Sequence, residues 1–258
     1  MKGVILAGGT GTRLHPMTRI TNKHLLPVYT KPMIYYPIET LVNAGITDIM
    51  VVTGGNHAGE FLRLLGDGRE FGLKHLSYAY QDKAGGIAEA LGLTENFVDG
   101  DKFVVMLGDN ILEESIEPYV ENFQKQERGG RVLLKEMSDP QHLRHLGVPK
   151  FEDGRIAFVQ EKPVDPPSQY AVIGIYMYDA SVFDIVAAVQ PSARGELEIT
   201  DVNNAYINRG EMEYDVINGF WGDAGESIDV YYQVIDYVRA HGVNKKTAPG
   251  AASAAGVS

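Results

Sequence analysis

The stretch "GVILAGGTGTRL", residues 3–14, decides the expected fold. Four apolar residues, Val4 to Ala7, predict a short buried strand that runs directly into a glycine-rich loop ending at Arg13. In open α/β sheets, ligands bind beyond the carboxyl ends of the strands, where the backbone N–H groups of such a loop can point at phosphate oxygens. The stretch therefore predicts an α/β fold with an anion-binding loop after its first strand.

The glycine spacing matches neither of two common phosphate-binding motifs. A dinucleotide-binding fingerprint needs a third glycine where this chain has Leu14. A P-loop that begins at Gly3 needs Gly-Lys-Ser/Thr where the chain reads Gly8 and Gly9. The loop is therefore either a third kind of phosphate-binding loop or an ordinary turn.

Composition limits the classes of function. The chain has 258 residues, of which 44% are apolar and 22% charged, and this predicts a folded protein with a sizeable core. A net charge of -11 without a run of Lys and Arg argues against general binding to nucleic acid or anionic membranes. The absence of cysteine excludes disulfides and thiol catalysis. Without a recognisable signal sequence or a long apolar run, we expect a cytoplasmic location.

Strand-like and helix-like stretches alternate through the first half, as "VILA", "IYYPIETLVNAG", "DIMVVT" and "EFLRLLG" show, and this pattern predicts a parallel sheet flanked by helices. In the second half "RIAFVQEK" and "YAVIGIYMY" follow each other without a helix, which predicts a mixed or antiparallel extension. Later helices are expected to end at Gly210 and Gly242. We expect one domain over residues 1–243 and a disordered tail, rich in small residues, over 244–258.

Charged residues stand near the predicted loop and strand ends. Arg13 ends the loop, and Lys23 follows in "TNKHLLP". Asp109 comes two residues after the strand "FVVML", where a carboxylate can bind a divalent cation, although an aspartate that caps the next helix is an equally good interpretation. Asp223 lies in "FWGDAGES" and could be an ordinary turn residue.

Two further polar segments have ordinary interpretations. Glu161 and Lys162 end a strand before Pro163, and such a pair usually lies on the solvated surface. The segment "PSARGELEITD", residues 191–201, precedes a helix, so capping is the plain role of its charged residues.

Taken together and in order, these segments resemble one family. "LAGGTGTRL", "NKHLLPVYTKPMIYYPIETL", "QDKAGGIAEAL", "VVMLGDNI" and "EKP" are similar to the sugar nucleotidylyltransferases. "KPMIYYPI" and "PSARGELEITD" resemble their glucose-1-phosphate thymidylyltransferase branch in particular. The resemblance runs from Lys2 to about Gly242. It implies a Rossmann-like, mostly parallel mixed sheet flanked by helices, and an enzyme that makes dTDP-glucose and pyrophosphate from dTTP and glucose 1-phosphate.

The resemblance also implies roles for particular residues. The nucleotide would be bound by Leu6, Ala7, Gly8, Gly9, Thr10, Gly11, Thr12, Arg13, Lys23, Gln81, Gly86 and Asp109, with Gln81 and Gly86 at the thymine edge. The sugar phosphate would be bound by Gly147, Glu161, Lys162, Val172 and Tyr176, and Mg²⁺ by Asp109 and Asp223. The catalytic residues would be Arg13, Lys23, Asp109, Lys162 and Asp223. They would position and neutralise the reacting phosphates in an in-line displacement without a covalent intermediate.

Some alternatives stay open. Leu146 stands where the family commonly has tyrosine, and Gln160 stands where a second glutamate is common, so UTP or another sugar 1-phosphate remains an alternative substrate. An inactive regulatory subunit on the same fold should have lost some of the charged phosphate contacts, yet all five catalytic residues are present. The C-terminus is shorter than in members with an allosteric nucleotide site. Because family members are commonly homotetramers, we expect a homo-oligomer.

Overall fold

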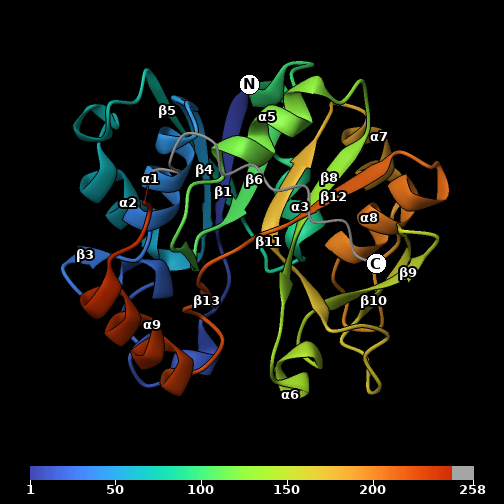
Figure 1. The fold of residues 1–258 in the computed structure, drawn as a ribbon. Coiled ribbons are helices and arrows are strands. Elements are labelled where there is room, and N and C mark those ends of the chain that lie inside the picture. Colours follow the sequence, from blue (N-terminus) through green and yellow to red (C-terminus); the bar gives the residue numbers. More distant parts are fainter. Residues whose placement is uncertain (246–258) are drawn as a thin grey trace. The chain divides into compact units, whose positions relative to one another are not determined.

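The computed structural model describes residues 1–245, which divide into two compact units, each built from several segments (Figure 1). Unit 1 contains Met1–Ala84, Val105–Pro118 and residues 219–245. Unit 2 contains Gly85–Val104 and Tyr119–Asn218. A single domain over residues 1–243 stays a prediction. None of the helices within residues 1–245 combines the length and the apolar character needed to cross a membrane.

Unit 1 is built on parallel strands. β1 (Lys2–Ala7), β4 (Asp48–Gly54) and β5 (His75–Gln81) pair in parallel, and β6 (Phe103–Leu107) lies beside β1. Helices α1 (Tyr35–Asn43) and α2 (Ala58–Leu65) pack against β1 and β4, as Figure 1 shows in blue. The apolar runs of β1 and β4 are buried, as expected for a parallel sheet that is covered on its faces. The predicted α/β alternation is therefore confirmed in this unit.

Two short antiparallel ribbons complete unit 1. β2 (Pro27–Val28) pairs with β3 (Lys31–Pro32), and β7 (Asn110–Leu112) pairs with β13 (Trp221–Asp223). Helix α9 (Ile228–His241) packs against β13 and β2. A buried cluster fills this region, made of Leu14, Val28, Met33, Tyr36, Ile111, Ala224, Tyr231, Val234 and Val238. The ribbons were not predicted, because strands of two or three residues are too short to show a period.

Unit 2 contains the mixed part of the sheet. β9 (Gly147–Glu152) pairs antiparallel with β10 (Arg155–Glu161) and with β11 (Tyr170–Tyr178). β11 also pairs antiparallel with β8 (Gly130–Glu136), and β8 pairs parallel with β12 (Met212–Val216). The expected mixed extension in the second half of the chain is confirmed.

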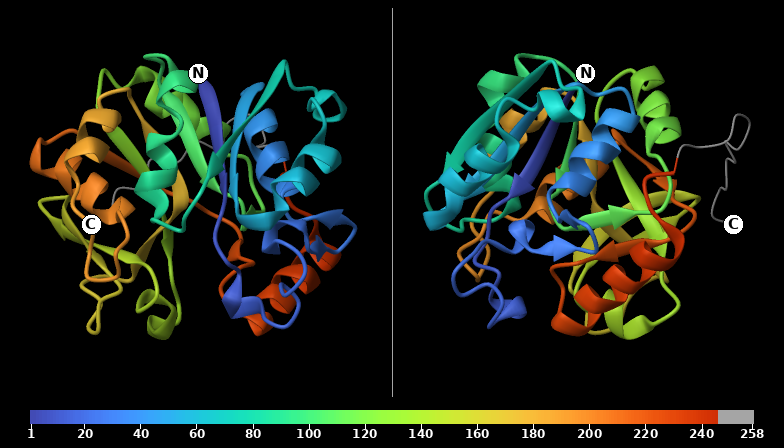
Figure 2. Two further views of the ribbon diagram at one scale, coloured as in Figure 1. Left: turned by 180° about the vertical axis from the view of Figure 1, so that it is seen from behind. Right: turned by 90° about the vertical axis from the view of Figure 1, so that its left-hand side faces the viewer.

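Helices pack on one side of unit 2. α3 (Ile87–Gly92), α7 (Val182–Ala188) and α8 (Ile199–Asn208) contact one another, and α8 also contacts β10 (Figure 2, left). α8 is followed by Gly210 at φ 69°, the left-handed conformation that glycine favours after a helix, as predicted. The remaining described α-helices are α4 (Glu95–Val98), α5 (Glu117–Lys125) and α6 (Pro140–Leu143).

The chain remains held beyond α9. The helix ends before Gly242, as predicted. Asn244 and Lys245, which we expected to open the disordered tail, donate their backbone N–H groups to Leu112 O (3.0 Å) and Glu113 O (2.8 Å). The rest of the expected tail, residues 246–258, lies outside the described residues.

Candidate active site

The glycine loop leaves the carboxyl end of β1, as predicted from the opening stretch. Gly9 and Gly11 have φ values of 93° and 63°, which glycine adopts without steric cost. The Thr18 hydroxyl donates to Gly11 O (2.7 Å), so a side chain outside the loop holds its shape. Arg13 lies exposed in the short helix η1 (Thr12–Leu14) that follows. The predicted nucleotide residues from Leu6 to Arg13 are thus brought together at one strand end.

Lys23 is held near this strand end by its neighbours. It begins the short helix η2 (Lys23–Leu25), whose cap is Asn22: the Asn22 Oδ1 accepts from His24 N–H (2.9 Å). The Asn22 Nδ2 donates to Ala7 O (3.4 Å), which ties the cap to the end of β1. Burial, and then the charge of Lys23, lower the pKa of His24 to about 3, so its imidazole is a neutral packing group.

Pairing of β7 with β13 brings the two predicted acids together. Asp109 immediately precedes β7, and Asp223 ends β13 opposite Asn110. Ala224 N–H donates to Asp109 O (2.9 Å), and the Lys23 ammonium donates to the Asp109 carboxylate. Asp109 is followed by a strand, so its interpretation as a helix cap is wrong.

The electrostatics of this cluster are those of two carboxylates and one ammonium in a poorly solvated place. Burial alone would raise the pKa of Asp109, but the charge of Lys23, together with His24 and the hydrogen bonds from Lys23 and Asn110, holds that pKa well below its usual range. Burial and then Asp109 raise the pKa of Asp223 well above its usual range. Burial would lower the pKa of Lys23, but Asp109 and Asp223 raise it instead. Lys23, even with the charge of Arg13, therefore does not fully compensate the two buried carboxylates.

The cluster contains two carboxylates, the kind of ligand that a divalent cation prefers. A Cβ on Gly225 would lie 2.8 Å from Lys23 Nζ and closer still to Asp109 Oδ2, so only glycine can approach the ion pair this closely. Among residues 1–245, no group of three or more His, Asp or Glu side chains is arranged around a metal position. Two carboxylates with completion by phosphate oxygens and water match the usual coordination of Mg²⁺ in nucleotide-binding sites.

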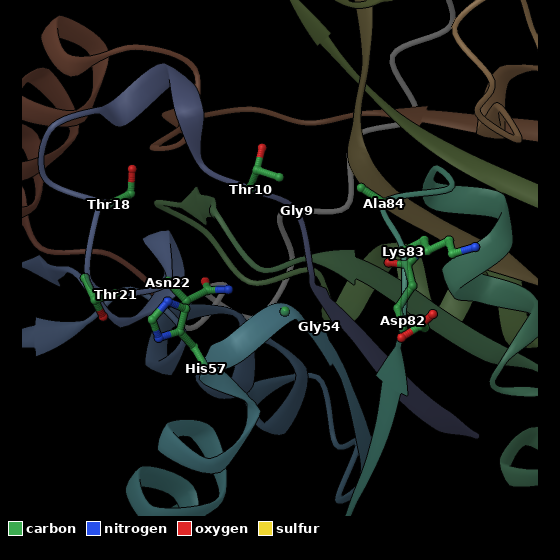
Figure 3. Close-up of a pocket in the computed structure, with 12 residues that line it drawn as sticks. Gly9, Thr10, Thr18, Thr21, Asn22, Gly54, His57, Asp82, Lys83 and Ala84 are labelled. Atoms are coloured by element: carbon green, nitrogen blue, oxygen red, sulfur yellow. The ribbon is translucent and has the colours of Figure 1, made fainter.

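A pocket of about 290 Å³ opens beside the glycine loop (Figure 3). In Figure 3, Thr18, Thr21 and Asn22 lie on one side and Asp82 to Ala84 on the other. The lining residues are Gly9, Thr10, Thr18, Thr21, Asn22, Gly54, Gly55, His57, Gln81, Asp82, Lys83 and Ala84. Gln81 ends β5 and is 7% exposed, and its Oε1 would lie 3.0 Å from a Cβ placed on Gly8. The bare backbone of Gly8 thus leaves room for the Gln81 amide.

Unit 2 brings three of the predicted sugar-binding residues into register. Gly147 of β9 pairs with Glu161 of β10 on one side and with Val172 of β11 on the other. The Thr200 hydroxyl donates to Glu161 Oε2 (2.6 Å), which fixes the carboxylate. The expected solvated surface pair of Glu161 and Lys162 therefore does not describe Glu161 fully, because a second side chain also holds its carboxylate.

Two cations of unit 2 lie near the same carboxylate. Lys162 adopts φ 46°, and its Nζ lies 3.4 Å from Glu161 Oε1. Arg194 lies 3.5 Å from that oxygen and makes a bidentate pair with Glu198 (2.9 and 2.8 Å). Glu198 makes no side-chain hydrogen bond as N-cap of α8, so the expectation that this segment caps the helix is wrong.

The other predicted residues of unit 2 lie deeper or elsewhere. Tyr176 of β11 is 5% exposed and stacks on Tyr178, with ring centroids 6.1 Å apart. Gly86 precedes α3 with φ 100°, and a Cβ there would lie 2.5 Å from Leu197 O. Gly86 therefore belongs to a tight backbone contact between the start of α3 and the segment before α8.

Sequence reasoning missed several residues that support the site. Thr200 contacts a carboxylate 39 positions away, and no local pattern announces such a contact. Thr18 supports the loop from seven positions away, and no pattern in the sequence indicates this role either. Asn22 could have been found, because asparagine before a helical turn is a common cap.

The fold is that of a nucleotidyltransferase. The family model of the nucleotidyl transferases matches residues 2–240, and the chain belongs to that family. It is 46% identical to a glucose-1-phosphate thymidylyltransferase of Actinoplanes sp., over 93% of this chain and 78% of that relative. It is 43% identical to the enzyme of the same name from Mycolicibacterium smegmatis, over 93% and 82% of the two chains. The resemblance drawn from the motifs is confirmed.

Solved structures agree with this family. A Bacillus anthracis protein described as a glucose-1-phosphate thymidylyltransferase, crystallised with sucrose, is 49% identical, with a TM-score of 0.88 over 95% of this chain and 98% of that one. A UDP-glucose pyrophosphorylase complexed with UDP-glucose is 26% identical, with a TM-score of 0.81 over 92% and 98% of the chains. The predicted Rossmann-like mixed sheet flanked by helices is confirmed as the fold class.

Proposed function

We propose that this protein transfers the thymidylyl group of dTTP to glucose 1-phosphate and releases pyrophosphate, in a reaction that depends on Mg²⁺. The observation that carries the proposal is the cluster of Lys23, Asp109 and Asp223 in unit 1, beside the end of the strand that bears the glycine loop. Membership of the nucleotidyl transferase family and the names of the similar relatives support this choice of reaction.

The nucleotide half of the reaction would take place in unit 1. The backbone N–H groups of the glycine loop would hold phosphate oxygens. Arg13 and Lys23 would bind the phosphates and stabilise the charge that grows on the departing pyrophosphate. Asp109 and Asp223 would hold Mg²⁺, which when bound neutralises phosphate charge and orients phosphate oxygens.

Gln81 would read the base. It is buried in the pocket beside Gly8, and a side-chain amide can donate to and accept from an imide edge. Thymine and uracil present the same imide edge, whereas cytosine and the purines do not. The pocket therefore supports dTTP and, as a second candidate, UTP. Gly86 is the second residue that the resemblance assigns to the base.

The sugar half would be supplied by unit 2. Glu161, oriented by Thr200, would accept hydrogen bonds from sugar hydroxyls, while Gly147, Val172 and Tyr176 would line the pocket. Lys162 would hold the phosphate of the sugar phosphate. A phosphate oxygen of the sugar phosphate would attack the α-phosphorus of dTTP in line, and no enzyme nucleophile is needed. Leu146 and Gln160 leave a related sugar 1-phosphate as an alternative acceptor. A homo-oligomer and a cytoplasmic location remain part of the proposal.

The deciding experiment is pyrophosphate release from a panel of nucleoside triphosphates and sugar 1-phosphates. We expect the highest kcat/KM for dTTP with glucose 1-phosphate, lower values for UTP, and complete loss with EDTA that excess Mg²⁺ restores. If no pair in the panel yields pyrophosphate with Mg²⁺ present, the proposed reaction is refuted. If turnover continues in EDTA, the metal part of the proposal is refuted.

A further inference from the structure

The β7–β13 ribbon that bears the two acids is fastened at its far end by one side chain. Glu113 follows β7 and lies opposite Phe220, which precedes β13. Glu113 N–H donates to Phe220 O (2.9 Å), but Phe220 N–H donates to the Glu113 carboxylate (3.0 Å). The backbone carbonyl of Glu113 accepts from Lys245 N–H instead (2.8 Å). The carboxylate thus replaces the carbonyl that would close the ribbon.

The Glu113 carboxylate joins three separate parts of unit 1. Besides Phe220 N–H, it accepts from the Tyr237 hydroxyl of α9 and from Lys245 Nζ (2.7 Å). These bonds, that to Lys245 first, lower the pKa of Glu113 to about 2, so the group is ionised at neutral pH. Tyr237 also stacks on Phe220, with ring centroids 3.8 Å apart. Phe220, just before β13, is therefore held through both its backbone N–H and its aromatic ring.

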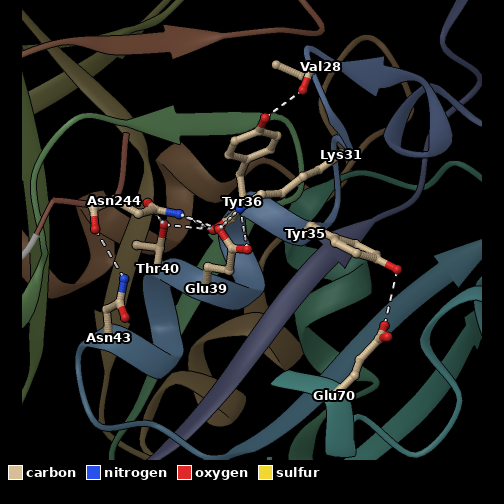
Figure 4. A network of polar contacts seen from close by, with 9 residues as sticks. All are labelled: Val28, Lys31, Tyr35, Tyr36, Glu39, Thr40, Asn43, Glu70 and Asn244. Atoms are coloured by element: carbon tan, nitrogen blue, oxygen red, sulfur yellow. Dashed lines mark hydrogen bonds and ion pairs between the residues drawn. The ribbon is translucent and has the colours of Figure 1, made fainter. Parts of the chain in front are cut away.

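Asn244 extends this arrangement to α1 (Figure 4). The Thr40 hydroxyl donates to Asn244 Oδ1 (2.8 Å), and Asn244 Nδ2 donates to Tyr36 O (3.2 Å). Asn43 Nδ2 donates to Asn244 O (3.3 Å). Because Asn244 N–H binds Leu112 O (3.0 Å), the residue links α1 to β7. We call Glu113, Asn244 and Lys245 the terminal clamp.

The ribbon needs such a clamp because it is short. Its register consists of three residue pairs, which is too few for independent stability. A slip of one residue would move every side chain of β13 to the opposite face and separate Asp223 from Asp109. Fastening the end that begins with Phe220 fixes the register at the end that carries the acids.

We propose that Glu113 is a positioning residue for the Asp109–Asp223 pair, and that the terminal clamp sets the affinity of this pair for a divalent cation. The proposal rests on the cation site of the proposed function. Glu113 touches neither acid and acts through the ribbon. The residues at the end of the described chain are thereby coupled to the site.

The test compares four variants of the full chain: Glu113→Ala, Glu113→Gln, Lys245→Met and Arg69→Met. Arg69→Met is the matched control, because it breaks an exposed ion pair of unit 1, with Asp67, that does not touch the ribbon. Mn²⁺ binding to the free protein is measured by electron paramagnetic resonance, and thermal melts report folding. Amide hydrogen exchange at residues 110–112 and 221–223 reports opening of the ribbon.

We expect Glu113→Ala to weaken Mn²⁺ binding about tenfold or more, as supporting residues of metal sites do. Glu113→Gln keeps an acceptor for Phe220 and Tyr237 but loses the bond to Lys245, so its Mn²⁺ affinity should be close to that of Lys245→Met. Lys245→Met should weaken binding less than Glu113→Ala, and Arg69→Met should not weaken it. Exchange in the ribbon should accelerate in the same order as the loss of affinity.

Three results would overturn the proposal: a wild-type protein that binds no Mn²⁺, a Glu113→Ala protein of lower melting temperature but unchanged affinity, or equal effects of Glu113→Gln and Glu113→Ala. If Glu113→Ala does not fold, Lys245→Met against Arg69→Met decides. A wild type that binds Mn²⁺ but makes no sugar nucleotide would refute the proposed reaction. The Mn²⁺ affinities of the variants would still test whether the terminal clamp sets the cation affinity.

Discussion

At the scale of single residues, the candidate site depends on Gly225, because glycine has no side chain to fill the position next to the Lys23–Asp109 ion pair. A Cβ at this position would collide with both partners of the Lys23–Asp109 ion pair. In Gly225→Ala the ion pair must therefore move. Because a displacement of about 1 Å can cost about 10²-fold in rate, we expect kcat/KM to fall by that order. The measurement is steady-state kinetics of dTDP-glucose formation.

Gly59→Ala is the matched control for this change. Gly59 lies in α2 of the same unit, and a Cβ there meets no atom within 4 Å. Alanine in a helix is favoured over glycine by about 0.5–1 kcal/mol, so this variant should keep its activity and gain slightly in stability. Equal kinetics for the two variants would show that the space beside Gly225 plays no part in catalysis.

Arg13 and Lys162 are both cations assigned to phosphate, yet replacing them should change different kinetic constants. Lys162 would face the sugar phosphate, which is charged before the reaction begins, so Lys162→Ala should mainly raise the KM for glucose 1-phosphate. Arg13 would face the phosphates on which charge grows in the transition state. Arg13→Ala should therefore lower kcat, by about 10²- to 10³-fold if it resembles the loss of one oxyanion donor.

The two kinetic patterns are separated by varying each substrate in turn, with thermal melts as the folding check. Should Arg13→Ala keep its kcat while only the KM for glucose 1-phosphate rises, the two cations have been assigned to the wrong partners.

The residues of the candidate site were found from their chemical type and from the family motifs. The contacts that orient them were not found. The hydrogen bond that holds Glu161, for example, comes from Thr200, which is far away in the sequence.

At the scale of elements, the predictable parts are those whose sequence shows a full period and a clear stop. α8 and α9 were placed correctly because each has several turns of apolar spacing followed by Gly210 or Gly242. The β7–β13 ribbon could not be predicted, because its strands have three residues each and are far apart in the sequence, at residues 110–112 and 221–223. Asp109 and Asp223 were therefore recognised singly, and their pairing is a tertiary result.

The same ribbon leads to a prediction about pH. The pKa of Glu113 is about 2 in the folded protein, below its ordinary value of 4.5. A lowered folded pKa contributes stability that is complete above about pH 4.5 and is lost as the pH falls towards 2. The melting temperature of the wild type should therefore exceed that of Glu113→Gln most at neutral pH. The gap should shrink below pH 4.5, as melts between pH 3 and 7 would show; a constant gap would mean that the charge of Glu113 does not stabilise the ribbon.

At the scale of the whole molecule, an acidic chain must hold polyanionic substrates. With a net charge of -11, the overall field repels dTTP and sugar phosphates, so binding depends on local donors such as Arg13 and Lys23. The residues assigned to the nucleotide lie mostly in unit 1, and those assigned to the sugar phosphate lie in unit 2. dTTP should therefore bind, and stabilise the protein, without glucose 1-phosphate.

This expectation gives a test that needs no turnover. A ligand present at about 100 times its Kd stabilises the folded state by about 2.7 kcal/mol, and in a chain of this size each kcal/mol raises the Tm by about 2–4 °C. dTTP with Mg²⁺ should then raise the Tm by about 5–10 °C, and UTP should do nearly as much because its imide edge is the same. CTP and ATP should raise it less. In Gln81→Ala, loss of the amide leaves that edge unpaired at a cost of about 1–3 kcal/mol, so the shift with dTTP should fall towards the shift with CTP. If CTP and ATP stabilise the wild type as strongly as dTTP, or if Gln81→Ala keeps the full preference, Gln81 does not read the base and the pocket beside the glycine loop is not where selectivity arises.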